Sequence, residues 1–425
     1  MQETDWISSA VMSARTNQTS RLSHTMYGRR ASLERFSTMV LVASVSNESM
    51  VSVNDLASSK MKECGEISRS ERFRHRSMHS SDAKTQSERF DRDFLPLVQQ
   101  PLHYQSQLRE PIDRYMSSFP AVVEGAQELL LGRCRLFTRD SSERVLYVGQ
   151  GEVAHAVPSQ CDVVMSDKAT TCHIIAVRSL CETPLTSLAH VDGPGYEQCV
   201  RKMIRFHREY AYQTYHGEEK KSEDEDGRVT VEVHIVGGYD DSEGSSREIS
   251  TFIIDVLARM AYDERHTMKI MLKTCAISSL NDDGTGRPVG RGLGISCSSG
   301  GVFLAKATKD VEGPATELRS ARLWSGKGGS ELTVIHSPYS EYLFVKPFEL
   351  ERPKHSRLLL SMLDTDLLQC TSTSPEVEEE GFCNEIRRTL RFMLKASSAA
   401  IFGEHVNRSV KFHRVGVNKW YSSPR

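Results

Sequence analysis

The chain has 425 residues, of which 38% are hydrophobic and 26% charged, and its formal net charge is −2. That length supplies one large domain or two ordinary ones. The near-neutral charge argues against a general attraction to nucleic acid or to a membrane surface, and no apolar run is long enough to span a bilayer. Because the N-terminus fits neither a signal nor a transit peptide, we expect an intracellular protein.

The ten cysteines are scattered along the chain and form no CxxC pair. This spacing argues against a disulfide framework and against a zinc site. We therefore expect reduced thiols in the cytoplasm or nucleus, no bound metal and no cofactor. The glycine cluster at residues 284–294 is interpreted as a loop, because it matches neither the dinucleotide-binding nor the P-loop motif.

The first 89 residues are rich in serine, arginine and threonine and poor in aromatic residues. Such a composition cannot bury enough apolar surface to offset its ordering entropy, which predicts a disordered tail at 1–89 and a folded domain at 90–425. Within this tail, the run from Arg29 to Ser32 resembles a kinase site, although chance produces such runs in any tail of this composition.

Strands and helices are predicted to alternate through the domain. Alternating or short apolar runs predict strands at 94–98, 134–138, 145–148, 152–157, 174–177, 183–193, 229–236, 268–277, 292–297, 301–306, 332–336, 342–345 and 410–412. Helical spacing predicts helices at 121–131, 195–212, 245–260, 314–323, 356–368 and 378–395. The strands at 145–157 and 292–306 look like hairpins, and 218–227 is a charged surface loop. The order favours a layered α/β domain with mixed or antiparallel sheets.

One stretch carries the chemistry. A small, polar run from Ser166 to Thr171 ends on Cys172, and the apolar run 174–177 follows. This pattern predicts a tight loop that leads into a buried strand, with the thiol at the strand's start. A thiol on a rigid strand end suits a nucleophile, whereas a buried structural cysteine is the competing interpretation.

A cysteine nucleophile needs an imidazole to take and return a proton. His190 follows eighteen positions later, and two adjacent antiparallel strands would bring it beside Cys172. His173 points to the other face of its strand, because side chains alternate along a strand. His234 remains a reserve candidate for the base.

Three blocks resemble the protein N-terminal asparagine amidohydrolases: residues 164–173 with Cys172, residues 190–193 with His190, and residues 232–241 with Gly237-Gly238. Weaker matches follow in order at 279–282, 318–324, 337–340, 372–375 and 422–424. The resemblance covers the chain from about residue 94 to its end.

The resemblance implies hydrolysis of an N-terminal asparagine side chain to aspartate and ammonia, on proteins that enter the N-degron degradation pathway. It also implies an α/β sandwich distantly related to chemoreceptor glutamine deamidases. Cys172 would be the nucleophile, His190 the base and Ser166 a hydroxyl partner. We expect a monomer whose partners are proteins or peptides with N-terminal asparagine. A deamidase of internal glutamine and an inactive interaction module remain alternatives.

Substrate recognition needs donors for the oxyanion and a carboxylate for the substrate α-ammonium. Backbone N–H groups around Thr171 and Cys172, or the Ser166 hydroxyl, are the candidate donors. Gly237-Gly238 lies where the chain turns or another backbone approaches closely, and we assign it to substrate binding. The candidate carboxylates are Asp167, Asp192, Asp240 and Glu378.

Overall fold

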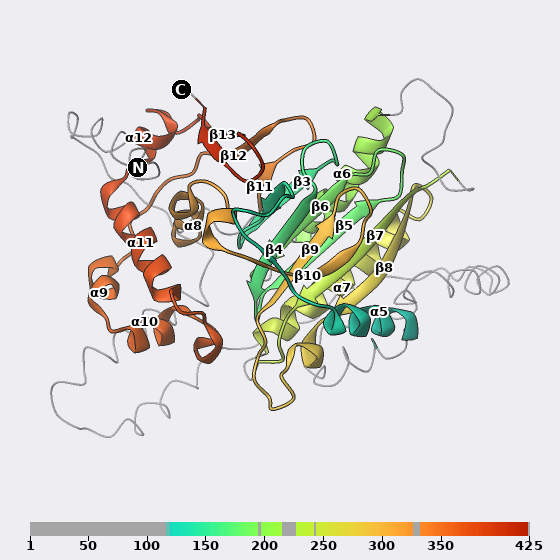
Figure 1. Cartoon of the computed structure of the whole chain (residues 1–425), viewed down its shortest axis with the longest axis horizontal. Coiled ribbons are helices and arrows are strands. Elements are labelled where there is room, and N and C mark those ends of the chain that lie inside the picture. The colour runs from blue at the N-terminus through green and yellow to red at the C-terminus, as the bar shows by residue number, and fades with distance from the viewer. Residues whose placement is uncertain are drawn as a thin grey trace, which may run out of the picture. The chain divides into compact units, whose positions relative to one another are not determined.

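The computed structural model describes residues 116, 119–193, 197–214, 227–241, 244–325 and 332–423, which form two large sheets, a small sheet and the helices around them (Figure 1). The predicted tail at 1–89 with Ser32, the predicted strand at 94–98 and most of the predicted loop at 218–227 lie outside the described residues. In the described part of the chain, no helix is long and apolar enough to cross a membrane.

The larger sheet has six strands in the order β11-β3-β6-β5-β7-β8. Pairing is parallel at its two ends, between β11 and β3 and between β7 and β8, and antiparallel in between. Its strands are β3 (Glu152–Ala156), β5 (His173–Ser179), β6 (Thr186–Val191), β7 (Val229–Gly237), β8 (Met268–Ala276) and β11 (Thr333–His336).

The second sheet has five strands in the order β1-β10-β9-β4-β2. β9 and β10 form the predicted antiparallel pair at 292–306, whereas β1 joins β10 and β2 joins β4 in parallel. Its strands are β1 (Arg135–Phe137), β2 (Val145–Tyr147), β4 (Val163–Ala169), β9 (Arg291–Ser296) and β10 (Val302–Ala307).

The two sheets share one apolar layer. Ile174 and Leu188 of the six-stranded sheet belong to the same buried cluster as Val164 and Leu293 of the five-stranded sheet. The opposite face of the six-stranded sheet packs with helices α6 (Glu197–Thr214) and α7 (Ser245–Asp263) in a separate cluster. The predicted layered α/β sandwich with mixed sheets is therefore confirmed.

Shorter helices complete the fold. These are α5 (Pro120–Leu131), α8 (Thr316–Trp324), α9 (Ser356–Ser361), α10 (Asp364–Thr371), α11 (Phe382–Lys395) and α12 (Ser398–Phe402), with single 3-10 turns at η4 (Ser278–Asn281), η5 (Lys309–Val311) and η6 (Pro375–Val377). The helices predicted from the sequence at 121–131, 195–212, 245–260 and 314–323 correspond to α5, α6, α7 and α8.

Five predictions of local structure were wrong. The run from Ser166 to Thr171, predicted as a tight loop, belongs to strand β4 as far as Ala169, and the predicted glycine loop at 284–294 ends where β9 begins at Arg291. The predicted hairpin at 145–157 does not form, because β2 pairs with β4 and β3 pairs with β6 in the other sheet. The predicted helix at 356–368 breaks at Met362 and Leu363, which both adopt extended backbone. The predicted helix at 378–395 begins only at Phe382, because Gly381 takes a φ of 110°.

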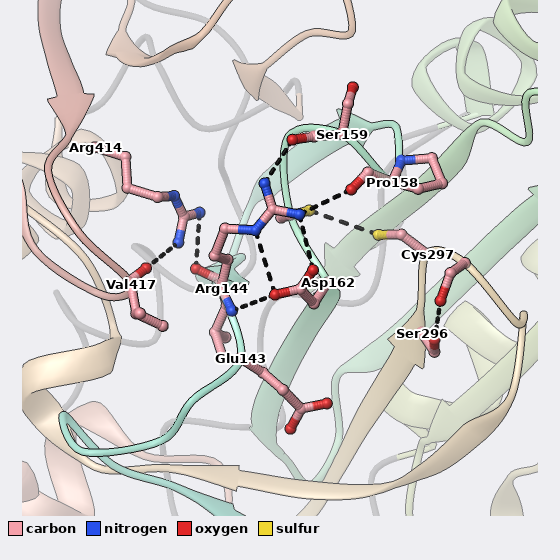
Figure 2. A network of polar contacts seen from close by, with 12 residues as sticks. Glu143, Arg144, Pro158, Ser159, Asp162, Ser296, Cys297, Arg414 and Val417 are labelled. Atoms are coloured by element: carbon pink, nitrogen blue, oxygen red, sulfur yellow. Dashed lines mark hydrogen bonds and ion pairs between the residues drawn. The ribbon is translucent and has the colours of Figure 1, made fainter.

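A three-stranded sheet of β12 (Tyr342–Val345), β13 (Val410–Arg414) and β14 (Trp420–Ser422) lies against the end of β2. Arg414 donates to the Val145 carbonyl at 3.0 Å, while Asn418 accepts from the Val145 N–H at 2.9 Å. Figure 2 shows Arg414, which also donates to the Val417 carbonyl at 2.7 Å. Nearby, Arg144 binds Asp162 and the Pro158 carbonyl. These bonds satisfy backbone groups on the outer edge of β2, which would otherwise be exposed to pairing with another strand.

Candidate active site

Cys172 stands immediately before β5, as the sequence predicted. Its carbonyl accepts a hydrogen bond from the Gly238 N–H at 2.9 Å. A Cβ at Gly237 would lie 2.3 Å from that carbonyl oxygen, and a Cβ at Gly238 would lie 2.2 Å from the His173 ring. The predicted close backbone approach at this glycine pair is therefore confirmed, and both glycines support the backbone that carries the thiol.

Cys172 and His190 lie on the same face of neighbouring strands. Ile174 pairs with His190 across the β5–β6 ladder, and Cys172 points to the same face as Ile174 because side chains alternate. This diagonal relationship places two Cβ atoms about 7–8 Å apart or somewhat less, within reach of a thiol and an imidazole. His173 points the other way, where its Nε2 lies 2.6 Å from Ser250 Oγ of α7.

Ser166 reaches His190 from the facing sheet. Its Oγ lies 2.8 Å from His190 Nδ1, and both residues are almost fully buried. Because Nδ1 is held by this bond, Nε2 is the ring nitrogen that does not contact Ser166. An Nδ1–H that donates to Ser166 keeps the imidazole in the tautomer whose Nε2 can accept a proton.

A bulge in β4 follows Ser166. Ser166 pairs with Leu293 and Ala169 with Arg291, so two residues of β4 face Gly292 alone. A Cβ at Gly292 would lie 1.9 Å from the Ala305 carbonyl oxygen and 2.8 Å from Asp167 Cβ, so no other residue fits there. The bulge therefore determines the orientation of β4 directly after the serine.

Asp167 does not join the site. It accepts hydrogen bonds from the Tyr147 hydroxyl at 2.7 Å and from the Ala307 N–H at 2.8 Å. Tyr147 and Ala307 belong to the cluster on the outer face of the five-stranded sheet, opposite the layer that contains Val164. Asp167 of β4 therefore links β4 to β2 through Tyr147 and to β10 through Ala307, on the face of the sheet that points away from Cys172.

A neighbouring protonated histidine commonly lowers the pKa of a cysteine thiol, but the electrostatics of this pair act in the opposite direction. Burial and the negative charges of Asp192 and Glu378 raise the pKa of Cys172 well above its usual value. Burial lowers the pKa of His190 to about 4, although Asp192 opposes this effect. The free protein therefore holds a neutral thiol beside a neutral imidazole.

A family model matches this part of the chain. The model described as Protein N-terminal asparagine amidohydrolase covers residues 137–422, more than half of the 425 residues, and spans Ser166, Cys172 and His190. The chain belongs to the protein N-terminal asparagine amidohydrolase family. The resemblance found in the sequence blocks, and the assignment to an enzyme family, are thus confirmed.

Relatives that carry this family name come from animals and a plant. The human protein is 28% identical over 304 residues, which are 69% of this chain and 90% of the relative. The pig protein is 28% identical over 276 residues, or 63% of this chain and 81% of the relative. The Arabidopsis thaliana protein is 22% identical over 284 residues, or 60% of this chain and 74% of the relative.

His234, the reserve base, is separated from the thiol. It lies four residues along β7 from Gly238, the residue bonded to Cys172, which is about 13 Å at the usual rise of a strand. Its Nδ1 lies 3.1 Å from Thr274 Oγ1. The geometry therefore favours His190 as the base in this amidohydrolase.

Glu378 comes close to Cys172 although it lies more than 200 positions away in the chain. Thr171 Oγ1 lies 2.9 Å from Thr373 Oγ1, and Ser372 donates to the Glu378 carboxylate. The segment at 372–378 is therefore joined to the loop that carries the thiol. Burial raises the pKa of Glu378.

The two remaining candidate carboxylates differ in position. Asp192 follows β6 directly, and its charge acts on both Cys172 and His190. Asp240 instead forms an ion pair with Arg247 of α7. Among the four predicted carboxylates, Asp192 and Glu378 are therefore the two whose charges act on Cys172.

One residue at the site was missed by the sequence analysis. Gln150, in the turn between β2 and β3, directs its Nε2 toward Cys172 Sγ at 3.8 Å. The Gly149-Gln150-Gly151 pattern predicted a hairpin turn, and nothing in it pointed to the thiol 22 positions later. Only the divergence of β2 and β3 into two sheets places this turn beside β6.

Proposed function

We propose that this protein hydrolyses the side-chain amide of an N-terminal asparagine, which yields N-terminal aspartate and ammonia. The observation that carries the proposal is the placement of Cys172 and His190 on one face of adjacent strands, inside the region that matches the amidohydrolase family. Membership of the family supports N-terminal asparagine as the substrate. The positions of Cys172 and His190 support amide hydrolysis by a cysteine nucleophile. The aspartate product would mark its carrier for turnover through the N-degron pathway.

The mechanism uses the thiol as a nucleophile. Cys172 Sγ attacks the amide carbon while its proton moves to His190 Nε2, and the carbonyl electron pair moves to oxygen. As the C–N bond breaks, His190 returns the proton and ammonia leaves. His190 then takes a proton from water, which attacks the thioester and releases the aspartate side chain and the thiol.

The negative charges at Asp192 and Glu378 favour a substrate with a free α-ammonium. Each carboxylate raises the pKa of the Cys172 thiol. A substrate ammonium bound near them would offset their charge and so lower the cost of forming a thiolate. This effect would couple amide hydrolysis to recognition of the chain terminus.

An internal glutamine deamidase would use the same Cys–His pair but would have no need for an ammonium site. Asparagine is one methylene shorter than glutamine, and a pocket that discriminates by size alone gives about 10- to 200-fold selectivity. The carboxylates whose charges act on the thiol therefore favour an N-terminal asparagine over an internal glutamine as the substrate. They also favour an active enzyme over an inactive interaction module.

The test is a mass-spectrometric assay on three peptides that start with Asn, Gln or acetyl-Asn. We expect a gain of 1 Da only for free N-terminal Asn, and none with the Cys172→Ala variant. Equal conversion of acetyl-Asn would contradict the N-terminal assignment. Activity that survives in the Cys172→Ala variant would contradict the nucleophile, and no conversion of any peptide would favour the inactive module.

A further inference from the structure

We propose that Gln150 donates a hydrogen bond to the oxyanion that forms when Cys172 attacks the substrate amide. This inference rests on the proposed function. Gln150 Nε2 lies 3.8 Å from Cys172 Sγ, so an amide carbon bonded to Sγ would bring its oxygen into the region that the side-chain amide faces. In the free protein the acceptor is only a sulfur atom, which is weak and easily exchanged for an oxyanion.

The backbone of the Gln150 turn is bonded to the strand of the base. The Gly151 N–H donates to the His190 carbonyl at 2.9 Å, and the Gly151 carbonyl accepts from the Thr333 N–H at 3.0 Å. Gly151 takes a φ of 70°, and a Cβ there would lie 2.6 Å from the Arg322 guanidinium. The backbone of the turn that carries Gln150 is therefore hydrogen-bonded directly to the backbone of His190, the proposed base.

A buried ion pair holds the turn from its other side. Glu152 accepts from Arg319 Nε at 2.9 Å and from the Gly149 N–H at 2.8 Å. Arg322, also on α8, donates to the Gly151 carbonyl. Arg319 and Glu152 are almost fully buried, and a buried pair of this kind adds little net stability, because the loss of water around both charges offsets their attraction. These residues are positioning residues for Gln150.

The other two candidate hydroxyls already have partners, and Ser166 is fully buried. Ser166 Oγ is bonded to His190 Nδ1, and Thr171 Oγ1 is bonded to Thr373 Oγ1. Gln150 is exposed and neutral, so it can meet an incoming amide and does not compete with His190 for the proton. With the backbone N–H of Cys172 as a second donor, Gln150 would complete an oxyanion hole.

The experiment compares three full-length variants with the wild type. Gln150→Met keeps the length of the side chain and removes its donor, and Gln150→Glu replaces the donor with an acceptor. Gln127→Met changes an exposed glutamine on α5 and serves as the matched control. We would measure kcat and KM on an N-terminal Asn peptide, and the pH dependence of Cys172 alkylation by iodoacetamide.

We expect both Gln150 variants to lower kcat by about 100- to 1,000-fold, the usual loss for one oxyanion donor, with little change in KM. The alkylation midpoint of Gln150→Met should match the wild type, and Gln127→Met should keep full activity. Unchanged kcat in Gln150→Met would overturn the inference while the proposed function stands. A raised alkylation midpoint would also overturn it, because Gln150 would then stabilise the thiolate. A wild type without activity would overturn both.

Discussion

Ser166 Oγ on one sheet lies 2.8 Å from His190 Nδ1 on the other sheet. This hydrogen bond joins the two sheets at His190, the residue proposed as the general base. Neither residue is accessible enough for solvent to replace this bond. The imidazole is therefore oriented by a residue that lies across the interior of the sandwich, and the packing of the two sheets determines the direction in which Nε2 points.

The first prediction concerns this bond. Ser166→Ala removes the partner of a buried ring nitrogen, a loss worth about 1–3 kcal/mol, and should lower kcat about 5- to 150-fold while KM stays nearly unchanged. Steady-state kinetics on an N-terminal Asn peptide measures both constants. Ser166→Thr keeps the hydroxyl and should restore part of kcat, whereas a purely structural role would lower the melting temperature and leave kcat per folded molecule unaffected.

A second prediction separates the two candidate bases. His190→Ala removes the proton acceptor and should lower kcat about 100- to 10,000-fold, the usual contribution of a general base. His234→Gln can keep a hydrogen bond to Thr274 and should retain most of the activity. The reverse result, an active His190→Ala beside an inactive His234→Gln, would assign the base to His234.

A third prediction concerns recognition of the substrate terminus. Glu378→Gln removes a charge that raises the pKa of the thiol, so Cys172 should react with iodoacetamide at lower pH than in the wild type. KM for the N-terminal Asn peptide should rise about tenfold, the equivalent of 1.4 kcal/mol of lost attraction for the α-ammonium. Glu376→Gln, on the exposed neighbour, is the matched control and should change neither quantity.

The fourth prediction concerns stability in acid. Burial lowers the pKa of His155 and His173 to about 3, and that of His190, His234 and His336 to about 4, from an ordinary value of 6.5. Between pH 6.5 and 4 the unfolded chain binds protons at these histidines and the folded chain does not. The free energy of unfolding should therefore be highest above pH 6.5 and fall as the pH drops, by about 1.4 kcal/mol per pH unit for each such histidine.

Urea unfolding at pH 7.5, 6.0 and 5.0 measures this dependence. We expect the urea midpoint to fall steadily below pH 6.5. Removal of one of these groups in the His234→Gln variant should make the decrease less steep. A midpoint that stays constant from pH 7.5 to pH 5 would show that these histidines titrate alike in the folded and unfolded chain.

Much of the site was evident from the order of the residues. The polar run before Cys172 and the apolar run after it located the start of a buried strand, and strand alternation directed His173 away from the thiol. The double glycine at 237–238 indicated a close backbone approach. These are local properties, because the alternation of side chains and the conformational freedom of glycine act within a few residues.

Only the tertiary structure decided which of these residues meet. Local patterns located β2 and β3 but could not reveal that they belong to different sheets, so Gln150 was read as a hairpin residue. The neutral states of Cys172 and His190 depend on burial between two sheets, and that of Cys172 also depends on Glu378, which comes from a distant part of the chain. Strand partners and electric fields arise from packing between segments far apart in sequence, and no short stretch of residues contains that information.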